Sequence, residues 1–193
     1  GQVTAQRRDL MIDVNQLRRG ISFLQGDEIF KVTEYSHNKP GRGKATIRVS
    51  VRNVRTGANL QMTFNSGDRV EDIRLDKRTV EYLYDDGQFY VFMDTSTYEQ
   101  PQVAHAVIGD DARWLTENMV LELLLYGSEV IDYNLPLNVE LKVVDAEMAV
   151  AGDTATGATK EVITETGVKV RTPLFVAVGD VINIGLDLAA ESV

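Results

Sequence analysis

The chain has 193 residues and no cysteine, which excludes a disulfide scaffold and thiolate chemistry. No run of eighteen apolar residues occurs, so the sequence predicts no membrane-spanning helix. The net charge of −9 is divided unevenly, because residues 1–74 carry +5 and residues 75–193 carry −14. This split predicts two kinds of partner: phosphates for the basic part and basic protein for the acidic part.

The first ten residues lack the apolar core of a signal peptide. We interpret residues 1–10 as an N-terminal extension, either native or left by a cloning vector, with Met11 as a candidate natural start. The sequence therefore predicts a cytoplasmic protein.

Residues 11–74 form the first predicted module. Short strands with alternating apolar residues are expected at 11–14, 29–35, 47–51 and 60–64, with turns at 26–27, 55–57 and 66–68. About 60 residues of this pattern predict a small SH3-like barrel.

The segment HNKPGRGKA, at positions 37–45, predicts a hairpin tip inside this module. Pro40 fixes its own φ, and Gly41 and Gly43 permit positive φ and leave Arg42 unshielded. Arg42 should therefore be a long cation held away from the protein body, with five donors and a permanent charge. The alternative is an ordinary solvated turn, since glycine, proline and basic residues are common on surfaces.

Residues 75–138 form the second predicted module. Its strands are expected at 80–84, 89–93, 119–125 and 130–133. A short helix is expected at 112–118, with Asp110 or Asp111 as its N-cap. The sequence at 134–136 breaks the pattern and marks a boundary.

Residues 139–193 form the third predicted module. Strands are expected at 139–144, 168–170, 175–178 and 181–184, and a polar loop is expected at 152–160. Modules two and three each have the length and strand spacing of an OB-type barrel. The predicted fold class is therefore all-β.

Enzyme chemistry is not evident in the sequence, and we expect neither a catalytic residue nor a metal site. The only histidines are His37, at the base of the basic loop, and His105, and no known catalytic motif surrounds them. The pairs Asp85-Asp86 and Asp110-Asp111 fit turns and caps. Trp114 and the tyrosines fall on apolar faces, so core packing is favoured over stacking on bases.

Nine motifs lie in order along residues 11–184: KPGRGKA (39–45), NVRTGA (53–58), TFNSGDRVED (63–72), YLYDDGQFYVFMD (82–94), GDDARWL (109–115), VELKVVD (139–145), GDTATGATK (152–160), ETG (165–167) and PLFVAVGDVI (173–182). In sequence and spacing they resemble bacterial elongation factor P. The resemblance implies an SH3-like (KOW-type) domain followed by two OB domains, in an L shape similar to transfer RNA.

The resemblance also implies a function. Such factors bind the ribosome beside the peptidyl-tRNA when synthesis stalls at consecutive prolines, and they promote peptide bond formation without being enzymes. We expect this chain to be a monomer without a bound cofactor. The third module distinguishes the chain from the two-domain relatives of eukaryotes and archaea.

Site residues follow from the same resemblance. The tRNA-contacting tip corresponds to Lys39, Pro40, Gly41, Arg42, Gly43 and Lys44. The tip residue is often modified in the family, and an arginine there can receive a rhamnose from a glycosyltransferase, so Arg42 is the expected modification site. Gly152, Asp153 and Thr154 match the loop that approaches the exit-site mRNA codon.

The C-terminal end departs from the family. Gly185–Val193 lacks the usual tyrosine and arginine, so the family's C-terminal RNA contacts do not carry over. The alternative function is a general RNA-binding OB-fold protein without a ribosome-specific role. Its basic aromatic groove would be hard to build in modules with a charge of −14.

Overall fold

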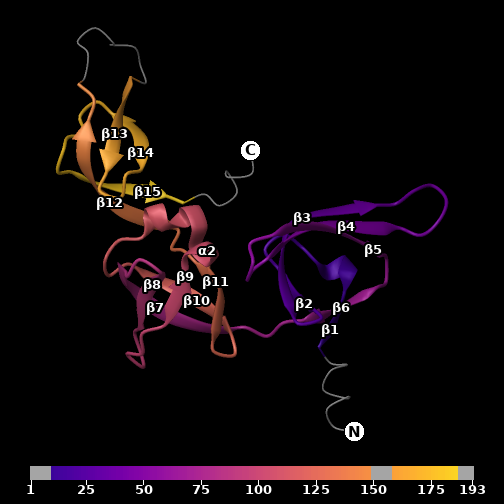
Figure 1. The fold of residues 1–193 in the computed structure, drawn as a ribbon. Coiled ribbons are helices and arrows are strands. Elements are labelled where there is room, and N and C mark those ends of the chain that lie inside the picture. The colour runs from indigo at the N-terminus through magenta and orange to yellow at the C-terminus, as the bar shows by residue number, and fades with distance from the viewer. Residues whose placement is uncertain (1–9, 149–157, 187–193) are drawn as a thin grey trace. The chain divides into compact units, whose positions relative to one another are not determined.

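The computed structural model describes residues 10–148 and 158–186, whose strands form three β-sheets (Figure 1). One α-helix, α2 (His105–Ile108), and two 3-10 helices, η1 (Val14–Gln16) and η2 (Gly109–Trp114), accompany the strands in these ranges. The all-β prediction is confirmed. The chain divides into two compact units, and the first consists of residues 1–78, 104–107 and 123–133.

The first sheet has six strands in the order β1-β6-β2-β3-β4-β5. The strands are β1 (Met11–Asp13), β2 (Ser22–Gln25), β3 (Glu28–Asn38), β4 (Thr46–Asn53), β5 (Asn59–Asn65) and β6 (Arg69–Asp72). All neighbours pair antiparallel. Every strand predicted for this module is present, and β2 and β6 are additional.

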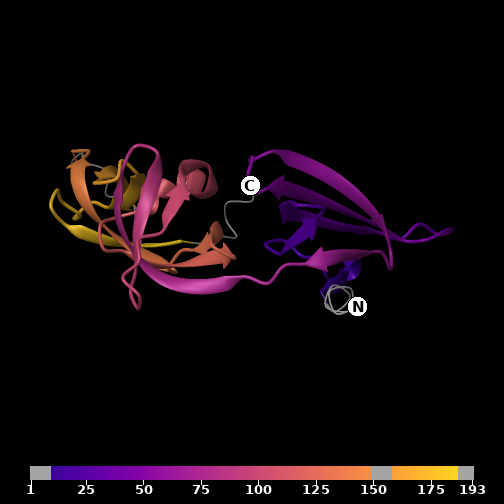
Figure 2. The ribbon, with the colours of Figure 1, turned by 60° about the horizontal axis from the view of Figure 1, so that its bottom comes forward.

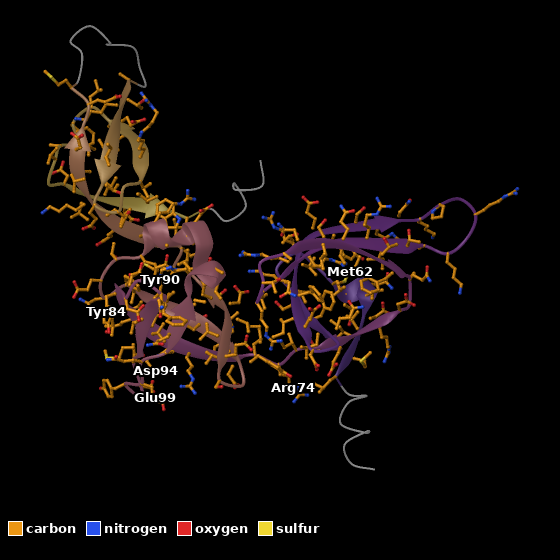
Figure 3. The ribbon with its side chains drawn as sticks, viewed as in Figure 1. Met62, Arg74, Tyr84, Tyr90, Asp94 and Glu99 are labelled. Carbon is orange, nitrogen blue, oxygen red and sulfur yellow. The ribbon has the colours of Figure 1, made fainter. Side chains whose placement is uncertain are left out.

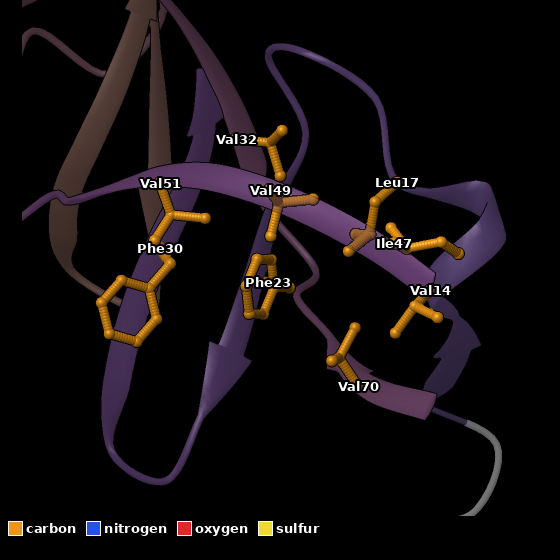
Figure 4. Close-up of a cluster of buried hydrophobic side chains, with 9 residues drawn as sticks. All are labelled: Val14, Leu17, Phe23, Phe30, Val32, Ile47, Val49, Val51 and Val70. Atoms are coloured by element: carbon orange, nitrogen blue, oxygen red, sulfur yellow. The ribbon is translucent and has the colours of Figure 1, made fainter. Parts of the chain in front are cut away.

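A hydrophobic core fills the inside of this first sheet (Figure 4). Ile47, Val49 and Val51 of β4 are fully buried, because alternate residues of a strand point to the same face. Phe23 and Phe30 pack with their ring centroids 5.9 Å apart. Each such buried side chain contributes about 1.5–3 kcal/mol, so this core gives the hairpin above it a firm base.

A smaller hydrophobic cluster joins this sheet to a later part of the chain. Leu24, Ile29 and Ile73 are buried together with Ile131 of β11 (Glu129–Asn134), all within the first compact unit. The hairpin that ends in β11 is therefore anchored on the first module by apolar packing.

The second sheet has the order β11-β10-β7-β8-β9. Its other strands are β7 (Asp76–Asp85), β8 (Phe89–Asp94), β9 (Gln102–Ala104) and β10 (Val120–Tyr126). The turn between β7 and β8 is closed by the Asp86 carboxylate, which accepts hydrogen bonds from the backbone N–H groups of Gln88 (2.8 Å) and Phe89 (2.7 Å). Asp86 thus has the turn-forming role expected from the sequence.

The predicted helix at 112–118 is wrong in its position. The helical segment begins at His105 and ends at Trp114, and the N-cap of η2 is Ile108, which makes no side-chain capping bond. The acidic pair at 110–111 lies instead in the first turn of η2, where carboxylates are favourable. Asn118, at φ +66°, donates its N–H to the carbonyl of Tyr82 (2.8 Å), so this part of the chain turns into β10.

The third sheet has the order β14-β13-β12-β15. Its strands are β12 (Asn138–Ala146), β13 (Thr159–Thr164), β14 (Lys169–Pro173) and β15 (Val181–Gly185). The strand predicted at 175–178 is wrong, because this segment forms turns. The Asp180 carboxylate accepts a hydrogen bond from the Ala177 N–H (2.9 Å), while Val176 alone of the segment is buried in the core.

Candidate functional site

The loop at residues 39–45 joins β3 to β4 and extends beyond the rest of the six-stranded sheet (Figures 1 and 2). Every residue from 39 to 44 is exposed to solvent. The predicted hairpin is confirmed, and its tip is the outermost part of that sheet.

Three paired strands support the tip from below. Asn38 pairs with Thr46 between β3 and β4, and Thr46 also pairs with Asn65 of β5. The next residue of β4, Ile47, is fully buried in the core. The loop therefore leaves a hydrogen-bonded and packed base, which limits the directions in which its tip can point.

The two tip glycines have different backbone conformations. Gly43 lies at φ +104°, a region that side chains with a Cβ rarely adopt. Gly41 has no positive φ, and nothing lies within 4 Å of the place where a Cβ would stand. Both glycines permit a positive φ, as expected, but of the two only Gly43 adopts one, so Gly43 makes the reversal.

The Arg42 side chain is exposed and makes no hydrogen bond or ion pair with any described residue. The same holds for the side chains of Lys39 and Lys44. A guanidinium in this position keeps all five donors available for a ligand and keeps its charge. The tip can thus bind phosphate or carbonyl oxygens of a partner.

The charged residues in the segment around the tip are all positive, apart from any charge on His37. Residues 35–67, which contain the C-terminal end of β3 and the whole of β4 and β5, hold six lysine and arginine residues and no aspartate or glutamate. Such a surface attracts polyanions, and the binding weakens with salt because counterions are released.

The tyrosines divide between packing and exposure. Tyr82 packs edge-on against Tyr90 and Phe92, with ring centroids 6.3 and 5.5 Å away. Burial raises the pKa of both Tyr82 and Tyr90, and the nearby Asp85 carboxylate raises it further. Tyr84, by contrast, is 53% exposed (labelled in Figure 3). Core packing therefore explains Tyr82 and Tyr90, but this expectation is wrong for Tyr84 and also for Tyr98 and Tyr126, which are 71% and 39% exposed.

Within residues 10–148 and 158–186, no group of three or more histidine and carboxylate side chains could hold a metal ion. None of the helices in these ranges is long and apolar enough to cross a membrane.

Comparisons with known proteins extend over the whole fold. The family models "Elongation factor P (EF-P) KOW-like domain", "Elongation factor P (EF-P) OB domain" and "Elongation factor P, C-terminal" match residues 13–70, 75–133 and 139–187. The chain belongs to the elongation factor P family. It is a translation elongation factor with the predicted KOW-type and OB-type barrels.

Individual relatives agree with this membership. Elongation factor P of Syntrophomonas wolfei is 44% identical over 91% of this chain and 95% of its own length. Elongation factor P of Moorella thermoacetica is 41% identical, over 90% and 94%. A solved structure, eukaryotic translation initiation factor 5A from Methanococcus jannaschii, aligns with a TM-score of 0.51 over 65% of this chain and 91% of that chain. At 21% identity, this last similarity shows the fold alone.

Two segments noted in the sequence fall outside the described residues. These are the expected codon loop, Gly152, Asp153 and Thr154, and the divergent C-terminal end after residue 186. The role of this loop stays a prediction.

Sequence reasoning missed one contact of this elongation factor entirely. Arg55 was placed only in a turn, but its guanidinium forms an ion pair with Glu129, 74 positions further along the chain. No local pattern signals a pair so distant in sequence. The NVRTGA motif at 53–58 was the one hint that this turn has a specific geometry.

Proposed function

We propose that this factor binds the ribosome beside the peptidyl-tRNA and promotes peptide bond formation where synthesis stalls at consecutive prolines. The ribosome performs the reaction and the factor is not an enzyme. Arg42, at the tip, orients the acceptor end of the peptidyl-tRNA. Membership of the elongation factor P family supports this proposal.

A single observation carries the assignment of Arg42. Its guanidinium is exposed and unpaired among the described residues, at the end of a hairpin whose base is buried and paired. A structural arginine would find a partner within its own fold. This side chain has none, so its donors are available for another molecule.

Positioning is the mechanism that such a group can supply. A prolyl residue restricts the conformations of the reacting amine and of the growing chain, so the reactive geometry is rarely sampled. Holding the acceptor end in place lowers the entropic cost of reaching that geometry, which in favourable cases is worth several kcal/mol. Lys39 and Lys44 would add phosphate contacts on either side of the tip.

The proposed RNA contacts comprise two segments. The tip residues Lys39, Pro40, Gly41, Arg42, Gly43 and Lys44 contact the tRNA. The loop Gly152-Asp153-Thr154 approaches the exit-site codon, and the family resemblance is its support.

We further propose that Arg42 carries a rhamnose in the native host. A guanidinium nitrogen would bond to the anomeric carbon of an activated deoxyhexose, losing one proton as the activating group departs. The exposure of the side chain supports access for the glycosyltransferase. Mass spectrometry of the peptide 37–48 from native cells would show one added deoxyhexose, and an unmodified peptide would contradict the proposal.

The test of the function is Arg42→Ala in reconstituted translation. We expect the rate at consecutive prolines to fall by roughly 10- to 100-fold, while a matched message without prolines is translated normally. Arg42→Lys, which keeps the charge but loses the planar fork, should be intermediate. Stability should change by less than about 0.5 kcal/mol. Stimulation that survives Arg42→Ala would contradict the assignment.

The alternative, a general RNA-binding protein, predicts something different. Such a protein would bind naked RNA as tightly as it binds stalled ribosomes. It would not distinguish a proline-rich message from another, so the same assay separates the two functions.

A further inference from the structure

The NVRTGA motif builds a fixed turn between β4 and β5. The side-chain oxygen of Asn53, which is 5% exposed, accepts hydrogen bonds from the backbone N–H groups of Arg55 (3.0 Å) and Thr56 (3.2 Å). Gly57 takes φ +77° and donates its N–H to the Asn53 carbonyl (2.8 Å). The backbone of Arg55 is therefore held in place by a buried amide.

The Arg55 side chain connects its own turn to two other segments of the first compact unit. Its Nε lies 2.9 Å from Glu129 Oε1, and its Nη2 lies 2.9 Å from Glu129 Oε2, which is a two-point contact with the first residue of β11. Its Nη1 donates to the carbonyl of Asp27 (2.6 Å), in the β2–β3 turn. The hydrogen bond from Arg55 lowers the pKa of Glu129, and the same bond raises the pKa of Arg55.

Further contacts attach the same hairpin to the first module. Lys31 forms an ion pair with Asp132 at 3.0 Å, and Ile131 is buried among apolar side chains of the first module. A separate hydrogen bond runs to α2 and not to the hairpin, from Arg52 Nη2 to the carbonyl of Ala106 (2.8 Å). The Arg55–Glu129 pair differs from these contacts because it alone fixes an orientation through two parallel hydrogen bonds.

We infer that Arg55 and Glu129 are positioning residues for the tip. They lock the first module, which carries Arg42, onto the β10–β11 hairpin, so that the tip is presented in one orientation. The effect on peptide bond formation rests on the proposed function, whereas the lock itself does not.

The Arg55–Glu129 pair is partly exposed, which indicates that its main role is to fix the orientation of the hairpin and not to stabilise the fold. The side chains of Arg55 and Glu129 are 40% and 44% exposed. Exposed ion pairs add little to stability because water competes for them, but a bidentate pair still restricts direction. The apolar cluster around Ile131 holds the hairpin against the first module, and the ion pair fixes the orientation of one against the other.

The first experiment measures the lock directly. The chain has no cysteine, so cysteines introduced at the exposed positions Gln61 and Ser128 are the only sites for spin labels. Arg55→Ala and Glu129→Ala should broaden the distance distribution between the labels. The matched control is Glu28→Gln, which removes an exposed carboxylate whose side chain makes no hydrogen bond or ion pair with any described residue. A width unchanged by both alanine variants would overturn the inference.

The second experiment measures the consequence in translation. At saturating factor, Arg55→Ala and Glu129→Ala should each slow synthesis at consecutive prolines by roughly 3- to 30-fold, since small misplacements can have large effects on rate. The exchanged pair, Arg55→Glu with Glu129→Arg, should recover a substantial part of the loss. A merely structural role would instead lower thermal stability in parallel with the rate and leave the distance distribution unchanged, and that result would overturn the inference.

The failures of the two proposals are distinguishable. If the unaltered protein does not stimulate proline-rich synthesis, or Arg42→Ala does not matter, the proposed function fails, and the label distances still decide whether the lock exists. If Arg42→Ala abolishes stimulation while both pair variants match the unaltered protein, the inference alone is overturned.

Discussion

At the scale of single residues, Arg42 is presented by neighbours with unequal roles. The sequence PGRG predicts a turn, and the exposure of its arginine follows from the lack of bulky neighbours. Which glycine carries the positive φ could not be predicted, because that choice depends on how β3 and β4 pair beneath the loop. Only the structure distinguishes Gly43 from Gly41.

This difference gives a matched pair of variants. Gly43→Ala should lower stability by up to about 1–2 kcal/mol, or rearrange the loop, because an L-residue with a Cβ is strained at φ +104°. Gly41→Ala has no such strain and open space for its methyl group, so it should be neutral or slightly stabilising. Denaturant unfolding and the proline-rich translation assay would measure both effects. Equal behaviour of the two variants would show that the tip backbone differs from the one described.

At the scale of elements, alternation of apolar residues predicted the strands that have one buried face. β4 is the clearest case, with Ile47, Val49 and Val51 fully buried. Short strands such as β2 and β6 have too few residues to show a period. The segment at 175–178 shows the opposite error, because an apolar run without alternation was interpreted as a strand although a turn closed by Asp180 forms there.

The two ends of β8 offer a prediction at this scale. Asp94, which is 4% exposed and is labelled in Figure 3, accepts hydrogen bonds from the backbone N–H groups of Ser96 (2.8 Å) and Thr97 (3.0 Å). Asp86 closes the other end in the same way but is exposed. Asp94→Ala should cost about 1–3 kcal/mol, since it removes a buried acceptor that satisfies two backbone N–H groups.

Asp86→Ala is the control, and it should cost only about 0.5–1 kcal/mol because water replaces the lost acceptor. Chemical denaturation of both variants measures the difference. If Asp86→Ala lowered the free energy of unfolding more than Asp94→Ala, burial of the carboxylate would not determine how much these turns stabilise the fold.

At the scale of the whole molecule, the sequence predicted the number of barrels and the charge split but not the lock between Arg55 and Glu129. Composition and strand spacing depend on residues that are close together in the sequence, so both can be predicted without a structure. A pair 74 positions apart depends on the tertiary fold, and neither residue is unusual in its own surroundings. Contacts of this kind are found only once both turns have been placed in the same compact unit.

The last prediction follows from the uneven charge of the chain, which is positive in residues 1–74 and negative in residues 75–193. If the basic first module contacts tRNA phosphates, Lys39→Glu with Lys44→Glu should weaken binding to stalled ribosomes and reduce the salt dependence of that binding. The slope of log affinity against log salt should fall by about 2 when two phosphate contacts are lost.

The matched control is Lys142→Glu with Lys169→Glu, which changes the charge equally at two exposed positions of the acidic part. That double variant should leave the slope nearly unchanged, because those residues lie in the part that is expected to face protein. Affinity measured across a salt series decides the matter. The same slope for both double variants would mean that net charge alone governs binding, and the oriented contact of the tip with tRNA would have to be abandoned.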